Sequence, residues 1–229
     1  MTTQVTIASR FCGPPHSGNG GYCSGLAAAG IEGTVEVTLR RPPPLDQALR
    51  VERETGVVLN DAGEVVVEAR PARLALEVPP APSFEDAEAM SRRFRGFTIH
   101  AFPTCFVCGP VRAPGDGLRI FPGGSADDRL VSAPWVPDRS LAGVGGRIAP
   151  EFLWSALDCP GYFAVAVPGE RAVLGRMTAE VEPTIAPGER CVVVGWPIAR
   201  SGRKLEAGTA LYDDGGALRG RSRQTWITT

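Results

Sequence analysis

The stretch that most constrains the fold is residues 149–162, which would be apolar on almost every side as a helix. At about 100° per residue, its large apolar side chains cover most of the circumference. Glu151, Ser155 and Asp158 share the one narrow polar stripe. A helix that is apolar nearly all round is buried, so we expect this stripe to meet polar groups inside the protein.

The predicted ends of this helix decide how its two acidic residues are interpreted. Pro150 suits a first helical position, and Pro160 with Gly161 predicts that the helix stops there. Glu151 then lies in the first turn, where the helix dipole stabilises a carboxylate. Asp158 lies in the last turn, where the dipole opposes a negative charge. It therefore either accepts N–H groups of the following turn or is a catalytic carboxylate.

The composition limits the partners and the location of the protein. The 229 residues are 43% hydrophobic and 21% charged, as in a globular protein with a sizeable core. The net charge of −1 predicts neither nucleic acid nor a membrane surface as partner, because both attract a basic excess. The start has no signal-peptide pattern, and no run of about 18 apolar residues could cross a membrane. We expect a cytoplasmic protein whose six cysteines are reduced.

A second buried helix is predicted near the start of the chain. A Gly-rich lead-in at 17–21 runs into small and apolar residues up to residue 30. The hydrophobic period then becomes two, since Val35, Val37 and Leu39 alternate with polar residues, which predicts a half-buried strand. Further strands are expected at 48–54, 56–59 and 64–69, with a hairpin turn at 60–63.

The middle of the chain, residues 78–128, reads as a connecting segment. Three prolines between 79 and 82 mark its start, and Ser83 followed by Asp86 resembles a capping box, which predicts a short helix. The remainder is rich in proline and glycine and has weak periodicity. A segment of that length normally has a function, so we expect part of it to cover the core or a pocket.

The order of predicted elements repeats after the long buried helix. Strands are expected at 173–182, 190–198, 206–212 and 217–227, with turns at 202–204 and 213–216. Each half thus has a buried helix, a strand, a break, further strands, an Asp/Gly hairpin and a last strand. We therefore expect an α+β protein in three parts: 1–77, the connecting segment 78–128, and 129–229.

One buried helix wrapped by long antiparallel strands, occurring twice, resembles the double hotdog architecture, with two long antiparallel sheets each wrapped around a buried helix. The matching type is the thioesterase II type of acyl-CoA thioesterase, within the hotdog thioesterase superfamily. Four segments carry the resemblance. They are the Gly-Gly entry to the first helix at 20–27, the following strand at 37–42, the helix segment at 154–158 and the last-strand segment at 223–225.

This resemblance implies an acyl-CoA thioesterase. Asp158 would match the catalytic aspartate, acting as base for water or as nucleophile, and Gln224 would match the glutamine that holds the water. Backbone N–H groups of Gly20 and Gly21 would stabilise the oxyanion at the free end of the first helix. Asn19 could orient a carbonyl, although turn formation explains it equally well.

The family pattern is incomplete in this chain. The usual Thr or Ser on the strand after the second helix has no clear counterpart, and Thr178 is only a candidate substitute. His16 could polarise a thioester carbonyl or lie in a surface loop. Coenzyme A phosphates need exposed basic residues, and Arg203 is our candidate, with a solvated strand face as the alternative. Other arginines and lysines that could serve are Arg200, Lys204, Arg219, Arg221 and Arg223.

Cys105 and Cys108 form a Cys-x-x-Cys pair followed by glycine, which is typical of half a zinc site. No second such pair and no His-x-x-x-His pair is present, so other ligands would have to come from distant cysteines or histidines. A redox pair and buried small side chains are the alternatives. We favour buried side chains, and expect no metal and no organic cofactor.

We thus expect one working site per chain, an acyl-CoA or acyl-carrier thioester as substrate, and a homodimer. A non-catalytic acyl or acyl-CoA binding protein on the same fold is the main alternative, favoured by the missing Thr or Ser. A hotdog hydratase or dehydratase is a further one. Such enzymes pair an aspartate with a histidine, and neither His16 nor His100 lies on a predicted helix beside an acid.

Overall fold

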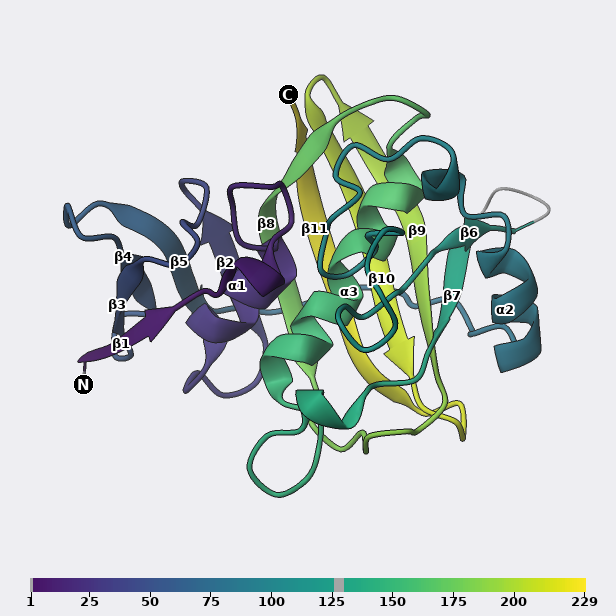
Figure 1. The fold of residues 1–229 in the computed structure, drawn as a ribbon, viewed down its shortest axis with the longest axis horizontal. Coiled ribbons are helices and arrows are strands. Elements are labelled where there is room, and N and C mark those ends of the chain that lie inside the picture. Colours follow the sequence, from purple (N-terminus) through teal and green to yellow (C-terminus); the bar gives the residue numbers. More distant parts are fainter. Residues whose placement is uncertain (1, 126–129) are drawn as a thin grey trace.

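Two buried helices lie on one face of a large antiparallel sheet (Figure 1). The computed structural model describes residues 2–125 and 130–229. Within these residues the sheet has 11 strands in the order β1-β3-β4-β5-β2-β8-β11-β10-β9-β7-β6.

The elements fall into three groups along the chain. The first group is β1 (Thr2–Thr6), the 3-10 turn η1 (Ser9–Phe11), α1 (Gly20–Ala28), β2 (Val35–Leu39), β3 (Ala48–Glu52), β4 (Val57–Leu59) and β5 (Val65–Pro71). The second is α2 (Phe84–Ser91), the 3-10 turn η2 (Arg95–Phe97) and β6 (Gly123–Gly124). The third is β7 (Val131–Trp135), the 3-10 turn η3 (Arg139–Leu141), α3 (Pro150–Val165), β8 (Ala172–Val181), β9 (Cys191–Ser201), β10 (Lys204–Tyr212) and β11 (Leu218–Thr228).

The first and third groups repeat one another. Counted from the outer edge, the first runs β1-β3-β4-β5-β2, and the third runs β7-β9-β10-β11-β8. The loops before the helices match too, because Asn19 N–H donates to the Phe11 carbonyl at 2.8 Å and Ala149 N–H to the Leu141 carbonyl at 3.0 Å. The described residues thus contain the internal repeat expected from the sequence.

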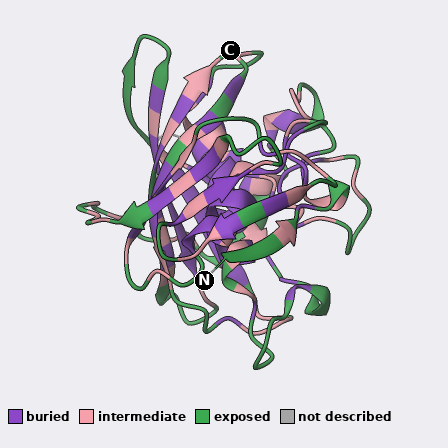
Figure 2. Ribbon diagram, turned by 90° about the vertical axis from the view of Figure 1, so that its left-hand side faces the viewer, coloured by how far each residue is buried: buried purple, intermediate pink, exposed green. Residues whose placement is uncertain are grey.

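The two halves share one sheet, which corrects the expectation of two sheets. β2 pairs with β8, placing Val35 opposite Ala179 and Val37 opposite Met177. All four side chains are buried, at 2% exposure or less. This pairing satisfies the backbone groups at the inner edge of each half and buries the side chains at the junction. Figure 2 shows the buried residues gathered in the interior of the fold.

Glycines in α1 let it pack directly against α3. A Cβ on Gly21 would lie 2.6 Å from the Trp154 carbonyl oxygen, and one on Gly25 would lie 2.5 Å from the Cα of Glu151. Both distances are shorter than real Cβ atoms allow. The small residues predicted for this helix thus serve a close approach of two helices.

α3 is longer than the sequence pattern predicted. It continues through Pro160 to Val165, so the expected stop at Pro160 and Gly161 is wrong, and Asp158 lies in the middle of the helix. Pro160 removes one backbone hydrogen bond. The Gln224 Nε2 atom donates to the Leu157 carbonyl at 2.6 Å, close to the missing backbone hydrogen bond. Burial of the next turn, with Phe163 at 5% exposure, also favours continuing the helix.

Part of the connecting segment covers the opposite face of the sheet. Ser83 caps α2 by accepting a hydrogen bond from the Asp86 N–H, as the capping-box pattern predicted. α2 and the residues before it pack on side chains that point away from α3, and Tyr212 Oη donates to the Pro79 carbonyl at 2.5 Å. The buried members of this second cluster are Ala87, Val192, Val194, Ala210 and Tyr212.

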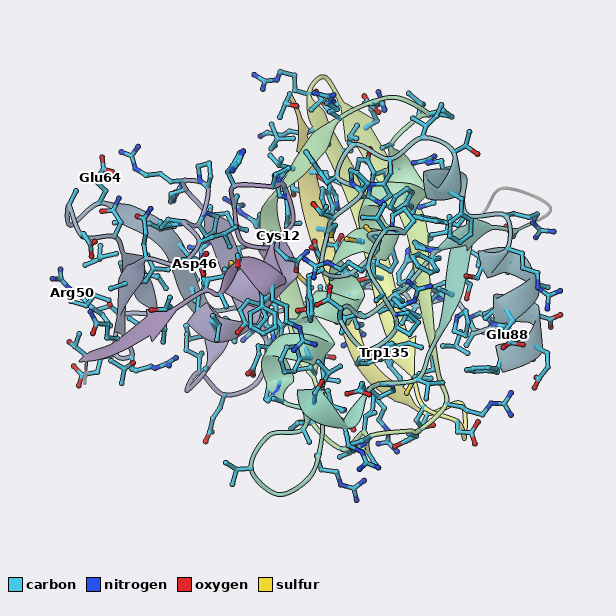
Figure 3. The ribbon with its side chains drawn as sticks, in the orientation of Figure 1. Cys12, Asp46, Arg50, Glu64, Glu88 and Trp135 are labelled. Atoms are coloured by element: carbon cyan, nitrogen blue, oxygen red, sulfur yellow. The ribbon has the colours of Figure 1, made fainter. Side chains whose placement is uncertain are left out.

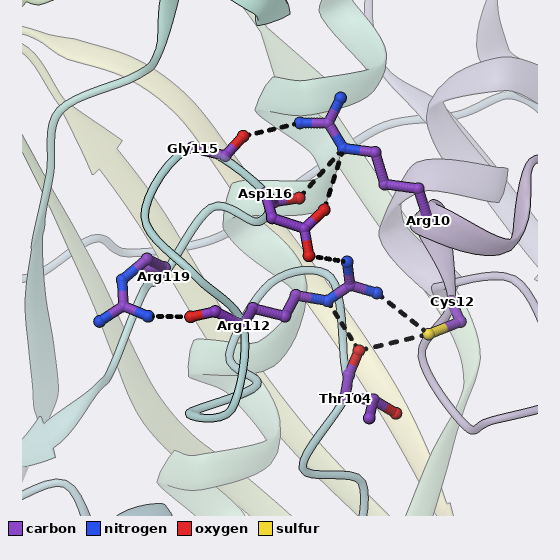
Figure 4. A network of polar contacts seen from close by, with 7 residues as sticks. All are labelled: Arg10, Cys12, Thr104, Arg112, Gly115, Asp116 and Arg119. Atoms are coloured by element: carbon purple, nitrogen blue, oxygen red, sulfur yellow. Dashed lines mark hydrogen bonds and ion pairs between the residues drawn. The ribbon is translucent and has the colours of Figure 1, made fainter.

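The later part of the connecting segment is tied to the start of the chain by two arginines (Figure 4). Arg10 donates to the carbonyls of Gly115 and Asp116, at 3.0 Å each. The Arg112 side chain, 9% exposed, reaches the Thr104 carbonyl at 2.8 Å and the Cys12 Sγ at 3.3 Å. These contacts hold the Cys-x-x-Cys loop against the first half.

Charged side chains lie at the outside of the first half and on α2. Figure 3 shows Arg50 and Glu64 at the edge of the first half and Glu88 on α2, all exposed, whereas Trp135 is buried at 2% exposure. No helix within residues 2–125 and 130–229 is long and apolar enough to cross a membrane.

Candidate functional site

A cavity of about 570 Å³ lies at the junction of the two halves. The start of α1 and its lead-in loop form one side, and α3 forms another. The remaining walls come from the loop after β2, residues 100–108 of the connecting segment, the start of β8 and the end of β11. Part of the connecting segment therefore lines a pocket, as expected from its length.

Asp158 is the acidic group in the wall of this cavity. Its side chain is 2% exposed, and Oδ2 accepts a hydrogen bond of 2.6 Å from Asn19 Nδ2. Oδ1 has no hydrogen-bond partner in the described part of the chain. Burial raises the pKa of Asp158 to about 7, with a further rise from Cys105, while the Gly21 N–H and Asn19 act in the opposite direction. A carboxyl with this pKa can exchange a proton near neutral pH.

Asn19 joins the two halves at this point. It is the N-cap of α1, and its Oδ1 accepts a 3.0 Å hydrogen bond from the Tyr22 N–H. Its Nδ2 group is then left to donate to Asp158. The N-cap contact fits the turn formation expected for Asn19, whereas its orienting a substrate carbonyl stays a prediction.

The two glycines at the start of α1 differ in position. Gly20 lines the cavity, and a Cβ there would lie 2.8 Å from the Leu174 side chain. The Gly21 N–H lies near the Asp158 carboxyl and favours its ionised form, although no hydrogen bond of normal geometry completes Oδ1. The positive end of the helix dipole is therefore directed toward Asp158.

Gln224 is not brought to Asp158. It is fully buried, its Nε2 donates to the Leu157 carbonyl and to Ser222 Oγ at 3.0 Å, and its Oε1 accepts from Trp226 Nε1 at 2.8 Å. The amide is thus committed to α3 and to its own strand, and it is absent from the cavity wall. The expected bond from Gln224 to Asp158 is not present among the described residues.

Arg203 does not line the cavity. Its guanidinium donates to the Thr228 carbonyl at 2.8 and 3.0 Å. Arg40 and Arg41 line the cavity instead, paired with Glu68 at 2.7 Å and Glu64 at 2.9 Å. These two arginines were visible in the sequence as the end of a strand. Only the fold shows that they reach the cavity.

Of the two histidines and Thr178, only the histidines line the cavity. His16 and His100 both line the cavity. Thr178 does not, and its Oγ1 atom lies 3.5 Å from a Glu36 carboxylate oxygen. Thr178 therefore does not replace the missing Thr or Ser of the family pattern.

Three cysteines meet in the cavity wall. Cys105 and Cys108 come from the connecting segment, and Cys159 comes from α3, next to Asp158. Their Sγ atoms all lie within 4.8 Å of one another, with 3.6 Å between Cys105 and Cys159. Hydrogen bonds from the Cys108 and Cys159 thiols lower the pKa of Cys105, whereas burial raises the pKa of the other two. Spacing in the sequence gives no sign that Cys159 joins the pair.

Comparison with known proteins places the fold. No family model matches the sequence, and no curated protein matches it. Solved structures do match over 100% of this chain. A candidate thioesterase from Novosphingobium aromaticivorans has 12% identity, a TM-score of 0.63 and 95% of its own chain covered.

Two further structures agree. The tesB protein of Mycobacterium avium subspecies paratuberculosis has 16% identity, a TM-score of 0.61 and 92% of its chain covered. A protein of unknown function with a hot dog fold from Alicyclobacillus acidocaldarius has 14% identity, a TM-score of 0.61 and 93% of its chain covered. At these identities the likeness shows a shared fold, the hotdog fold.

Proposed function

We propose that this protein is an acyl-CoA thioesterase built on a double hotdog, with units at 1–77 and 129–229 joined by 78–128. The observation that carries the proposal is the place of Asp158. It is a buried carboxyl in the wall of a largely apolar cavity, held by Asn19 from the other half. The shared fold with a candidate thioesterase supports the same reaction class.

In the proposed reaction Asp158 takes a proton from water, and the water oxygen forms a bond to the thioester carbonyl carbon. The carbon–sulfur bond then breaks, and the sulfur receives the proton from Asp158, which gives a carboxylic acid and a free thiol. The Gly20 N–H belongs to the first turn of α1, where it has no intrahelical acceptor, and is our candidate donor to the oxyanion. Gln224 acts as a positioning residue, since it holds the α3 backbone beside Asp158.

The cavity also suits the substrate class. Its volume of about 570 Å³ falls in the range of small-molecule sites. Arg40 and Arg41 replace Arg203 as the groups proposed to meet the coenzyme A phosphates, because they line the cavity. Phosphates are bound well by guanidinium groups.

Binding without hydrolysis is the second candidate function. The commitment of Gln224 to the Leu157 carbonyl favours it, because this amide is then not available to hold the attacking water. An acyl-CoA binding protein would use the same cavity and the same arginines but would release no thiol.

Free thiol release from short, medium, long and aromatic acyl-CoAs tests the proposal, with Asp158→Asn compared with the wild type. We expect this substitution, which keeps the size of the side chain, to lower the rate by about 10²- to 10⁴-fold. Asp138→Asn is the matched control, because Asp138 is the exposed N-cap of η3. Acyl-CoAs that raise the melting temperature without thiol release would show binding instead.

A cytoplasmic location and a homodimer stay predictions. Light scattering on the eluted peak of a size-exclusion column tests the second. A mass of one chain would contradict it.

A further inference from the structure

The three cavity cysteines have the arrangement of a ligand set. A tetrahedral zinc site with sulfur at about 2.3 Å has sulfur atoms about 3.8 Å apart. The Sγ atoms of Cys105 and Cys159 are 3.6 Å apart, and all three thiols lie within 4.8 Å of one another. Three thiolates could therefore close around one ion with only small side-chain movements.

The origin of the three side chains makes this arrangement specific. Two lie on one loop in the Cys-x-x-Cys spacing typical of a zinc knuckle, and the third comes from α3, 54 residues from Cys105. The loop is fixed by backbone hydrogen bonds, in which the Phe106 N–H donates to the Cys12 carbonyl at 2.7 Å and the Gly109 N–H to the Cys105 carbonyl at 2.9 Å. Backbone hydrogen bonds therefore hold the loop that carries two of the cysteines, and α3 holds the third.

The same cavity holds two buried polar atoms that have no hydrogen-bond partner in the described part of the chain. They are Oδ1 of Asp158 and Nε2 of His100. The other ring nitrogen of His100 accepts from the Phe102 N–H at 3.0 Å, so Nε2 is the atom left without a partner. Buried polar atoms without a partner are rare and call for an explanation, such as an ion or water.

We propose that Cys105, Cys108 and Cys159 bind one divalent ion of the zinc class, with the fourth coordination position facing the cavity. Three protein ligands and one open position are typical of catalytic zinc sites, whereas structural sites use four protein ligands. Thiolate ligands favour zinc over magnesium or calcium. The cavity gives the ion a path of entry, because all three cysteines line it.

This inference replaces the expectation of no metal, and it does not depend on thioester hydrolysis. The full-length protein, stripped with a chelator under reducing conditions, is titrated with Co²⁺ while the thiolate-to-cobalt charge-transfer absorption is followed. Zn²⁺ is then added to displace the cobalt, and bound zinc is counted by elemental analysis. We expect one ion per chain.

Single substitutions assign the ligands. Cys159→Ser and Cys105→Ser are each expected to weaken binding by on the order of 100-fold or more, since changes outside the ligand shell already cost about 10- to 100-fold. Cys191→Ser is the matched control, because Cys191 is buried but bonds to the Glu189 carbonyl away from the cavity. It should bind as the wild type does. Circular dichroism shows whether each variant is folded.

Three results would overturn the inference. One is a folded wild type that takes up no Co²⁺ or Zn²⁺ at stoichiometric concentration. Another is unchanged binding in both folded cysteine variants. The third is a disulfide between two of these cysteines in protein kept under reducing conditions, detected by mass spectrometry. Thiol release without metal binding would support the proposed function and contradict the metal site. Metal binding without thiol release would support the metal site and contradict thioester hydrolysis.

Discussion

The contact between Asn19 and Asp158 makes the sharpest quantitative prediction. Asn19→Ala removes an N-cap, worth about 1 kcal/mol. It also removes a hydrogen bond to a buried carboxyl, and bonds of this kind contribute about 1.5–3 kcal/mol when the carboxyl is charged. Both oxygens of Asp158 would then lack a partner in the described structure. We therefore expect the variant to lose about 2.5–4 kcal/mol of unfolding free energy.

Asn19→Ser separates the two contributions. Serine is as good an N-cap as asparagine, but its shorter side chain does not reach Asp158. We expect this variant to lose about 1.5–3 kcal/mol, which corresponds to a fall in melting temperature of about 3–12 °C for a chain of this size. The difference between the alanine and serine variants then reports the cap alone.

Urea unfolding followed by circular dichroism measures both losses, provided that unfolding free energy falls with urea concentration at the same slope in the variants and in the wild type. Fluorescence should give the same transition, which checks that the two halves unfold together. An Asn19→Ser variant within about 0.5 kcal/mol of the wild type, a loss far below that of a charge-assisted bond, would refute the reasoning. The bond between the halves would then contribute little to stability.

Three further predictions concern packing and acid stability. Gly21→Ala should lower stability by about 1–3 kcal/mol, since its methyl group would overlap the Trp154 carbonyl; an unchanged melting temperature would contradict the close packing of α1 and α3. Gln224→Leu removes the Nε2 hydrogen bond to the Leu157 carbonyl and leaves the buried Trp226 Nε1 without its acceptor, so it should cost about 1–3 kcal/mol in urea unfolding. The pKa of Asp213 is lowered because hydrogen bonds from the Ala217 N–H and Arg219 outweigh the effect of burial. Its stabilisation is present above the unfolded-state pKa, about 3.9, and is lost as pH falls through the lower folded-state pKa, so Asp213→Asn should flatten the acid limb of an unfolding curve.

The sequence predicted the elements that depend on neighbouring residues, namely periodic strands, turns and helix starts. The strand after α1 was predicted from its two-residue period and is present as β2, and the Asp/Gly hairpin at 213–216 lies between β10 and β11 as expected. β1, β6 and β7 were missed, because each is a short strand without a clear hydrophobic period. The extension of α3 beyond Pro160 was missed because tertiary burial outweighed the proline signal.

The site was predicted only in part, for the same reason. Asp158 stood out as a carboxyl on a buried helix and Asn19 as an amide in the loop before the other one, and the structure brings the two together. The partners of Gln224 and the arrival of Cys159 beside Cys105 depend on contacts between distant segments. The spacing of residues along the chain does not predict such contacts.

The repeat between the two halves does not extend to the polar pair of the site. In the matching loops, Ala149 stands where the first half has Asn19, since each donates its N–H to the end of the preceding 3-10 turn. Counting along each helix from its cap, Ala28 of α1 is the position equivalent to Asp158 of α3. Neither alanine carries a polar side chain, and Ala28 is buried at 6% exposure. The repeat is therefore equal in its backbone and unequal in its chemistry, because the polar contact between Asn19 and Asp158 has two alanines as its counterpart.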